Sequence, residues 1–297
     1  VEVTISDGTH TGRGECVPTP RYGECVETVL SDIQSALDAL THIDYQILQS
    51  LLPAGAARNA IDCALWDLSA KLKKSSVNNI LSFPAPIDIN TVQTISIDTP
   101  ARMKAKAESL ANYKQIKVKL NDKQIVKRLE AVHLGAPNCE ILVDANESWT
   151  ISILKSVLPK IAHLPIVLLE QPLKAGEDEL LRSINCPFPL GADESFHISE
   201  DIPRLAQIYD VINIKLDKCG GLTEAINIIN KAKEYQLDIM VGCMVGTSLS
   251  MAPGLIIATQ AKFVDLDAPL LISRDREFGL NIDNGVIKEL DPRLWGS

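Results

Sequence analysis

The middle of the chain contains a series of short apolar runs, each of which ends on a charged residue. The charged ends are spaced 25, 26, 23 and 22 residues apart, and they are Lys119, Asp144, Glu170, Asp193 and Lys215. Short β-branched runs at this period, separated by polar helical stretches, are typical of successive strand–helix units. A parallel sheet covered on both faces explains why the runs are apolar throughout. The period therefore predicts an α/β fold of the (β/α) barrel type.

Three consecutive strand ends in this series are acidic, namely Asp144, Glu170 and Asp193. In a (β/α) barrel the C-terminal ends of the strands meet at one mouth, so the three carboxylates should converge there. One such acid alone would be read as a solvated loop residue or a helix cap. Together they need a cation, because like charges at close range raise each other's pKa. Oxygen ligands without His or Cys favour Mg2+ over a transition metal.

Two further pairs of charged residues lie on predicted strands. Lys117 and Lys119 are two positions apart, so both side chains should face the mouth. Lysines on a strand can also mark an exposed sheet edge, but a central barrel strand has no edge. Asp265 and Asp267 share one strand face near the end of the barrel. That pair is either a solvated strand end or a receptor for a cation.

The same segments resemble the enolase superfamily, muconate lactonizing subgroup, and within it the bacterial L-Ala-D/L-Glu dipeptide epimerases. The barrel segments that carry the resemblance are 117–119 (KVK), 144–149 (DANESW), 170–172 (EQP), 192–195 (ADES) and 213–218 (NIKLDK). Segments 12–16 (GRGEC), 20–24 (PRYGE) and 52–60 (LPAGAARNA) are similar to the capping domain of that family. The resemblance thus extends over nearly the whole chain.

The expected architecture is a modified TIM barrel of the (β/α)7β type with an α+β capping domain. A predicted hairpin at 1–15 and helices at 26–40 and 54–72 place the capping domain at 1–88, with Pro84 and Pro86 near its end. The barrel is expected at 89–272, and residues 273–297 are expected to return to the capping domain. The chain begins at Val1 without an initiator Met. Because the family has an earlier strand and a mobile specificity loop, the native N-terminus is expected to be missing.

The resemblance implies Mg2+-dependent epimerisation of L-Ala-D-Glu to and from L-Ala-L-Glu in murein peptide recycling. It assigns Asp144, Glu170 and Asp193 to the metal. It also implies acid and base roles for Lys119 and Lys215 on opposite faces of the substrate, and an electrostatic role for Lys117. A lysine base works best when its pKa is lowered towards roughly 7 to 8.

For the substrate, the resemblance implies that Asp265 and Asp267 bind the α-ammonium group of the dipeptide, and that Arg21 and Tyr22 of the capping domain contribute to binding. Alternative reactions in the superfamily are N-acylamino acid racemisation, o-succinylbenzoate synthesis and cycloisomerisation. Substrates of the dehydratases and cycloisomerases carry no ammonium group for an Asp pair. The alternative that is not an enzyme is a metal-binding barrel without catalytic activity.

Composition excludes several other classes of partner. The net charge of -9 argues against nucleic acid or an anionic membrane surface. No apolar run approaches the roughly 18 residues of a membrane span. Seven scattered cysteines without a C-x-x-C pair indicate reduced thiols and a cytoplasmic protein. The expected partner is a small-molecule dipeptide, and a homo-oligomer is compatible with the sequence.

Overall fold

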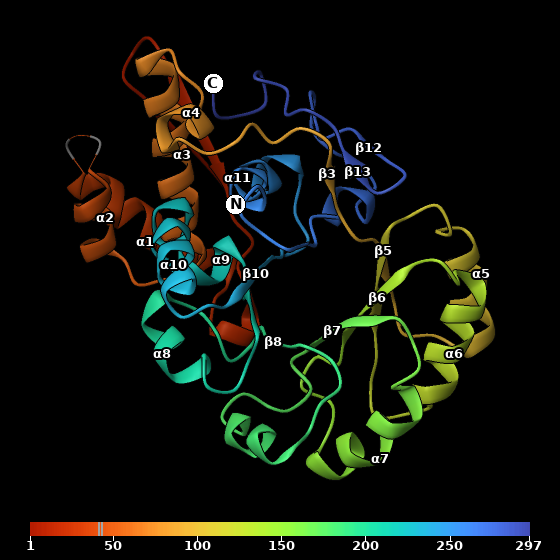
Figure 1. The fold of residues 1–297 in the computed structure, drawn as a ribbon. Coiled ribbons are helices and arrows are strands. Elements are labelled where there is room, and N and C mark those ends of the chain that lie inside the picture. Colours follow the sequence, from red (N-terminus) through yellow and green to blue (C-terminus); the bar gives the residue numbers. More distant parts are fainter. Residues whose placement is uncertain (41, 43) are drawn as a thin grey trace.

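The computed structural model describes residues 1–40, 42 and 44–297, and its largest element is a curled sheet of eight parallel strands. The strand order in the sheet follows the chain from β4 to β11. Figure 1 shows β5, β6, β7 and β8 in this order. The strands are β4 (Thr94–Ile95), β5 (Gln115–Lys119), β6 (Glu140–Asp144), β7 (Ile166–Glu170), β8 (Leu190–Ala192), β9 (Val211–Ile214), β10 (Asp238–Val241) and β11 (Phe263–Val264). The backbone N–H of Val92 donates to the carbonyl of Val264 at 2.9 Å and links the two ends of the sheet. This confirms the predicted (β/α)7β-type fold.

Helices connect successive strands on the outside of the sheet (Figure 1). They are α5 (Pro100–Glu108), α6 (Ile125–Gly135), α7 (Ile151–Ile161), α8 (Ile202–Leu205), α9 (Leu216–Cys219), α10 (Leu222–Glu234) and α11 (Ser248–Ala258). Short 3-10 helices occur at η2 (Asp178–Ser183) and η3 (Ser199–Asp201). Between β7 and β8 the only helix is η2, and Pro187 and Pro189 break any longer helix before β8.

Both faces of the barrel sheet are buried, which accounts for the continuous apolar runs. Ile141 and Val143 of β6 belong to the large cluster between sheet and helices, whereas Leu142 belongs to a small cluster with Leu168 and Met240. Strand register pairs Lys119 with Asp144, and Asp144 with Glu170. The charged strand ends are therefore neighbours at one end of the sheet.

The N-terminal region is a hairpin packed on helices, as the sequence predicts. It contains β1 (Glu2–Ser6), β2 (Thr11–Glu15), η1 (Pro20–Tyr22), α1 (Val26–Ala39), α2 (Tyr45–Leu51), α3 (Ala56–Lys73) and α4 (Val77–Leu81). Gly14 lets β2 approach α3, since a Cβ at this position would lie 2.1 Å from the carbonyl oxygen of Ala60. Helix α2 was not predicted; Asp44 caps it by accepting from the backbone N–H groups of Gln46 and Ile47.

Helix α3 also joins this region to the barrel beside the strand ends. Arg58 Nη2 donates to the carbonyl of Cys219 at 2.6 Å, and Asn59 Nδ2 donates to Asp217 Oδ1 at 2.8 Å. Both acceptors lie in α9, directly after Lys215. The N-terminal region is thus held over the end of the sheet where the charged residues gather.

The C-terminal residues lie against the N-terminal region. Strands β12 (Ile282–Asp283) and β13 (Val286–Ile287) form a small sheet with β3 (Ile89–Asn90), and η4 is Ala268–Leu270. Trp295 is buried, and its Nε1 donates to the carbonyl of Cys63 in α3 at 3.1 Å. Figure 1 places the C-terminal end beside α4. The exact domain boundaries stay predictions.

The seven cysteines of the chain are all free thiols in this structure. Over the described part of the chain, no helix is both long enough and apolar enough to cross a membrane.

Candidate active site

The three predicted metal ligands lie together at the C-terminal end of the barrel sheet. Asp144 is the last residue of β6, Glu170 is the last residue of β7, and Asp193 follows β8 directly. Each of the three is at most 1% exposed. The strand register, which aligns these ends, accounts for their convergence.

Lys117 of β5 lies among these carboxylates. Its Nζ is 2.7 Å from Asp265 Oδ2, 2.8 Å from Glu170 Oε2 and 3.2 Å from Asp144 Oδ2. Burial opposes the charged form of Lys117, yet the surrounding carboxylates, led by Asp144, raise its pKa well above the ordinary lysine value. Lys117 therefore carries a positive charge in this arrangement.

Lys119 lies one pleat further along β5, at the rim of the mouth. Its side chain is 40% exposed, and its Nζ is 3.4 Å from Asp144 Oδ2. It donates a hydrogen bond of 3.0 Å to Asn146 Oδ1. The two lysines of the K-x-K strand thus share a direction but differ in burial and partners.

Lys215 and Lys218 both contact Asp193. Lys215 Nζ lies 2.6 Å from Oδ2, while Lys218 Nζ lies 2.6 Å from Oδ1 and 2.6 Å from the main-chain carbonyl. Although burial favours its neutral form, the two lysines lower the pKa of Asp193 below the ordinary value. Burial likewise opposes the charge on Lys215, but Asp193 raises the pKa of Lys215. In this arrangement the pKa of Lys215 lies above the ordinary lysine value because a carboxylate is its direct partner.

Among the three predicted metal ligands, Glu170 is the one with a single lysine partner in the described part of the chain, Lys117. Its Oε1 accepts from Asn213 Nδ2 at 2.6 Å. Burial raises the pKa of Glu170 to about 7, with Lys117 opposing the shift and the neighbouring charges of Asp144 and Asp193 adding to it. Such a carboxyl group is stabilised in its charged form by any further cation that reaches it.

The carboxylate oxygens of Asp144, Glu170 and Asp193 are ligands of the kind that a hard divalent cation binds. Asp144 Oδ2 and Glu170 Oε2 are buried without a hydrogen-bond partner, and they contact lysine ammonium groups instead. Across the described residues, no three His, Cys, Asp or Glu side chains stand at metal-binding spacing. The lysines neutralise the carboxylates in this arrangement. Carboxylate oxygens of this kind are the ligands that Mg2+ prefers.

Asp265 and Asp267 follow β11 and face the same mouth. Asp265 Oδ2 binds Lys117, and its Oδ1 is buried without a hydrogen-bond partner. Asp267 Oδ2 accepts from the backbone N–H of Thr94 at 2.7 Å. Burial and then the charge of Asp265 raise the pKa of Asp267 to about 6. Leu266 between them is buried in the large core cluster. The predicted strand face for Asp265 and Asp267 is wrong, because β11 ends at Val264 and the two acids lie between β11 and η4.

Arg21 and Tyr22 reach the mouth from the N-terminal region. Arg21 forms an ion pair with Glu147, which follows β6. The ring of Tyr22 meets His197 edge to face at a centroid distance of 4.9 Å. Burial raises the pKa of Tyr22 to about 12, and the charge of Asp193 adds to the shift. All the predicted site residues are therefore brought to one end of the barrel.

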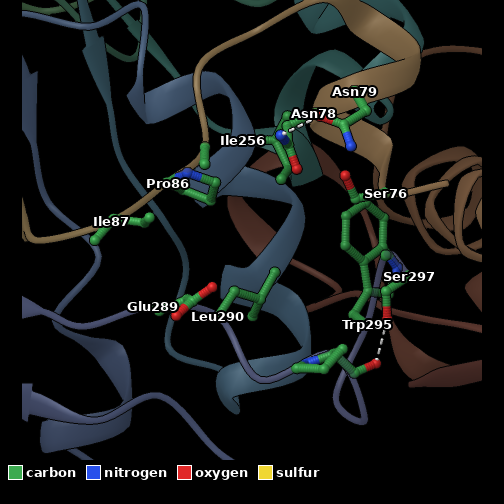
Figure 2. A pocket seen from close by; sticks show the side chains of 13 residues that line it. Ser76, Asn78, Asn79, Pro86, Ile87, Ile256, Glu289, Leu290, Trp295 and Ser297 are labelled. Carbon is green, nitrogen blue, oxygen red and sulfur yellow. Dashed lines mark hydrogen bonds between the residues drawn. The ribbon is translucent and has the colours of Figure 1, made fainter.

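A separate cavity of about 280 Å³ lies between α4 and the C-terminal segment. Figure 2 shows Trp295 and Ser297 on one side of it and Pro86 and Ile87 on the other. It contains none of the predicted site residues. The carboxylates and lysines at the strand ends remain the candidate active site.

Comparisons with known proteins agree with this geometry. Residues 102–287 match the enolase C-terminal domain-like family, and residues 1–82 match the N-terminal domain of mandelate racemase / muconate lactonizing enzyme. The chain belongs to the mandelate racemase/muconate lactonizing enzyme family of the enolase superfamily. The resemblance inferred from the strand-end segments is thereby confirmed.

Two relatives of this chain have names that describe isomerases of glutamate derivatives. An N-acetyl-D-glutamate racemase from Pseudoalteromonas sp. is 42% identical, over 100% of this chain and 95% of the racemase. The L-Ala-D/L-Glu epimerase of Escherichia coli (strain K12) is 39% identical, over 96% of this chain and 90% of the epimerase.

Two solved structures share the fold closely. An enolase family member from Agrobacterium tumefaciens, with homology to dipeptide epimerases, matches with a TM-score of 0.94 at 44% identity, over 99% of this chain and 91% of that chain. It contains sodium and L-Ala-L-Glu with an ordered loop. A dipeptide epimerase from Methylococcus capsulatus, complexed with Mg and L-Arg-D-Lys, matches at 0.88 with 30% identity, over 97% and 88% of the two chains.

Gln171, next to a predicted ligand, is a supporting residue of this family member that sequence reasoning missed. Its Oε1 accepts from the backbone N–H groups of Asp193 at 3.0 Å and Ser195 at 3.1 Å. Its Nε2 donates to Ser195 Oγ and to the hydroxyl of Tyr209. In the sequence, the only signal for Gln171 is its position beside Glu170 in the EQP segment. The side chain fixes the backbone that carries Asp193.

We expect Gln171→Leu to lower the free energy of unfolding by at least about 2 kcal/mol, because two buried backbone N–H groups lose their acceptor. Urea unfolding followed by circular dichroism measures the change. Gln207→Ala is the matched control, since this exposed amide pairs with Arg182 at the surface. Equal stability of the two variants would contradict the role of Gln171.

Proposed function

We propose that this chain is an isomerase that inverts the α-carbon of an N-acylated glutamate, with the dipeptide L-Ala-D/L-Glu as its substrate. The observation that carries the proposal is the placement of two lysines on either side of the carboxylates. Lys119 ends β5 beside Asp144, and Lys215 follows β9 beside Asp193. Amines on opposite faces of a substrate carbon can remove a proton from one face and return a proton to the other.

Asp144, Glu170 and Asp193 would hold Mg2+ in this proposal. Support comes from the carboxylate donor set and from the magnesium bound to the Methylococcus capsulatus epimerase. A bound Mg2+ supplies positive charge where negative charge develops on the substrate carboxylate. Lys117, whose pKa is raised, supplies a second fixed charge from the chain itself.

Lys119 and Lys215 then exchange the proton. Lys119 at the rim would act from one side. Lys215, which is buried deeper, would act from the other once Asp193 no longer pairs with it. The ion pair with Asp193 raises the pKa of Lys215, so Lys215 would act as a base only after this contact is released.

Substrate selection is proposed to depend on charges around the mouth. The Asp265 and Asp267 carboxylates would bind the α-ammonium group of the dipeptide. Arg21, whose side chain is 48% exposed, would bind the glutamate side-chain carboxylate beside Tyr22. A place in murein peptide recycling, and the cytoplasm as its location, follow from this choice of dipeptide.

The second candidate is racemisation of N-acetylglutamate. It is favoured by the 42% identity to the Pseudoalteromonas racemase. Both candidate substrates present a glutamate α-carbon with an acylated nitrogen, so the metal and lysine chemistry is shared. They differ in the ammonium group, which only the dipeptide carries. The Asp265 and Asp267 pair makes the dipeptide the first choice.

Calorimetric titration tests the metal site. We expect the wild type to bind Mg2+ and Asp193→Asn to bind it at least about tenfold more weakly, since a neutral amide replaces a charged ligand. Asp238→Asn, which removes one partner of the surface pair with Lys262, serves as the control. Equal Mg2+ affinity in the wild type and Asp193→Asn would exclude Asp193 as a ligand.

The two lysines are tested separately with each isomer of the dipeptide in D2O. Lys119→Ala and Lys215→Ala should each abolish epimerisation, because each variant lacks one of the two proton carriers. Each should retain α-proton exchange from only one isomer, which NMR or mass spectrometry detects. Lys262→Ala, at the surface, should behave like the wild type. Epimerisation by either active-site variant would rule out the two-base mechanism.

Asp267 is expected to set the preference for the ammonium group. Asp267→Asn should lower kcat/KM for L-Ala-L-Glu by more than about tenfold, because a charged contact contributes about 1.5–3 kcal/mol. With the pKa of Asp267 near 6, the carboxylate forms as the pH rises, so KM should fall between pH 5 and pH 7 in the wild type only. Equal turnover of N-acetylglutamate and the dipeptide by the wild type would favour the second candidate.

A further inference from the structure

Asn146 connects three charged groups of the candidate active site. It lies two residues after β6 in the left-handed region, with φ at 42°. Its backbone N–H donates to Asp144 Oδ1 at 3.0 Å. Its side-chain Oδ1 accepts from Lys119 Nζ at 3.0 Å, and its Nδ2 donates to Glu194 Oε1 at 3.2 Å. One small residue therefore touches a ligand, a base and a further carboxylate.

The two ends of the Asn146 amide are matched to opposite charges. The oxygen faces the ammonium of Lys119, and the nitrogen faces the carboxylate of Glu194. The reverse orientation would place donors against donors and acceptors against acceptors. Glu194 in turn is 9% exposed, and its other oxygen is buried without a hydrogen-bond partner. The amide is thus held from both ends, which fixes its position.

Lys119 is held by fewer and longer polar contacts than Lys117 on the same strand. Among the described residues, Asp144 and Asn146 are its polar neighbours, and the ion pair with Asp144 is the longer contact at 3.4 Å. Lys117, by contrast, has three carboxylates within 3.2 Å. A long side chain that is 40% exposed has many rotamers without such a contact.

We propose that Asn146 is the positioning residue for Lys119, which it orients through its side-chain amide. The inference rests on the proposed two-base function and adds a residue to it. An amide oxygen accepts a hydrogen bond from the lysine nitrogen whether the amine carries two or three hydrogens. A neutral partner therefore serves Lys119 through both halves of the reaction. The left-handed backbone turn brings the amide to the rim.

Asn146→Gly is the variant that tests this role, because glycine accepts the left-handed backbone and keeps the N–H to Asp144. Wild type, Lys119→Ala, Lys215→Ala, Asn146→Gly and Asn146→Gly/Lys119→Ala are compared by α-proton exchange in D2O. L-Ala-D-Glu and L-Ala-L-Glu are followed separately. Asn146→Ala gives the same comparison if the glycine variant folds poorly.

Asn146→Gly should slow exchange by about tenfold for one isomer only, namely the isomer whose exchange Lys119→Ala abolishes. Tenfold is the effect expected from losing a hydrogen bond to a charged group. In Asn146→Gly, exchange of the other isomer should stay within about twofold of the wild-type rate. In the double variant it should stay within about twofold of the rate in Lys119→Ala. Mg2+ affinity by calorimetry should stay within about threefold. Asn227→Ala, an exposed amide on α10, should match the wild type throughout.

Equal slowing of both isomers, or no slowing, would overturn the proposal. A tenfold loss of Mg2+ affinity in Asn146→Gly would also overturn it, since the residue would then act through Asp144. Failure of the two-base function looks different, because Lys119→Ala and Lys215→Ala would then lack opposite preferences for the two isomers. The lysine variants thus separate the two failures.

Discussion

The burial of several carboxylates at one end of a parallel barrel is the constraint on which the rest of this structure depends. Asp144, Glu170 and Asp193 are at most 1% exposed, and Asp265 lies beside them. Isolated buried charges cost many kcal/mol, so such groups persist only with cations and hydrogen bonds around them. Lys117 supplies one cation to three of them. The remaining acid, Asp193, is held by Lys215 and Lys218.

This arrangement links charge compensation to the proposed chemistry. The same lysines that neutralise the acids are the groups that would move protons or stabilise charge on the substrate. Asp144, Glu170 and Asp193 are the residues that would hold a divalent cation, which would supply positive charge at the carboxylates. Lys117, which has several partners, carries a positive charge in this arrangement.

The N-terminal region completes the site by closing one side of the mouth. Glu24 accepts from the backbone N–H of Thr19 at 2.9 Å and from that of Ala56 at 2.7 Å, so the turn carrying Arg21 and Tyr22 is tied to the start of α3. Its tip meets residues that follow β6 and β8. Arg21 and Tyr22 therefore reach the candidate site from the N-terminal region, whereas Asp265 and Asp267 reach it from the barrel.

The sequence alone determined the strand period, the acids at strand ends and the K-x-K pattern, because each is a local feature of a parallel strand. It also carried enough of the family segments to assign the superfamily. It did not predict α2, and it did not single out Asn146, Gln171 or Lys218 by role. Their contacts join separate strands and loops: Lys218 reaches Asp193 across 25 residues, and Asn146 reaches Glu194 across 48.

Only the tertiary structure decided which lysine pairs with which acid. Lys117 binds Asp265, which is 148 residues away, because the curled sheet brings the end of β11 near β4, as the Val92 to Val264 hydrogen bond shows. The pKa of Lys215 likewise depends on the carboxylate of Asp193, which follows a different strand and raises it. Strand spacing sets which residues reach the mouth. Distances of 2.6 to 3.4 Å between side chains from different strands set their charge states and partners, and no local pattern specifies those distances.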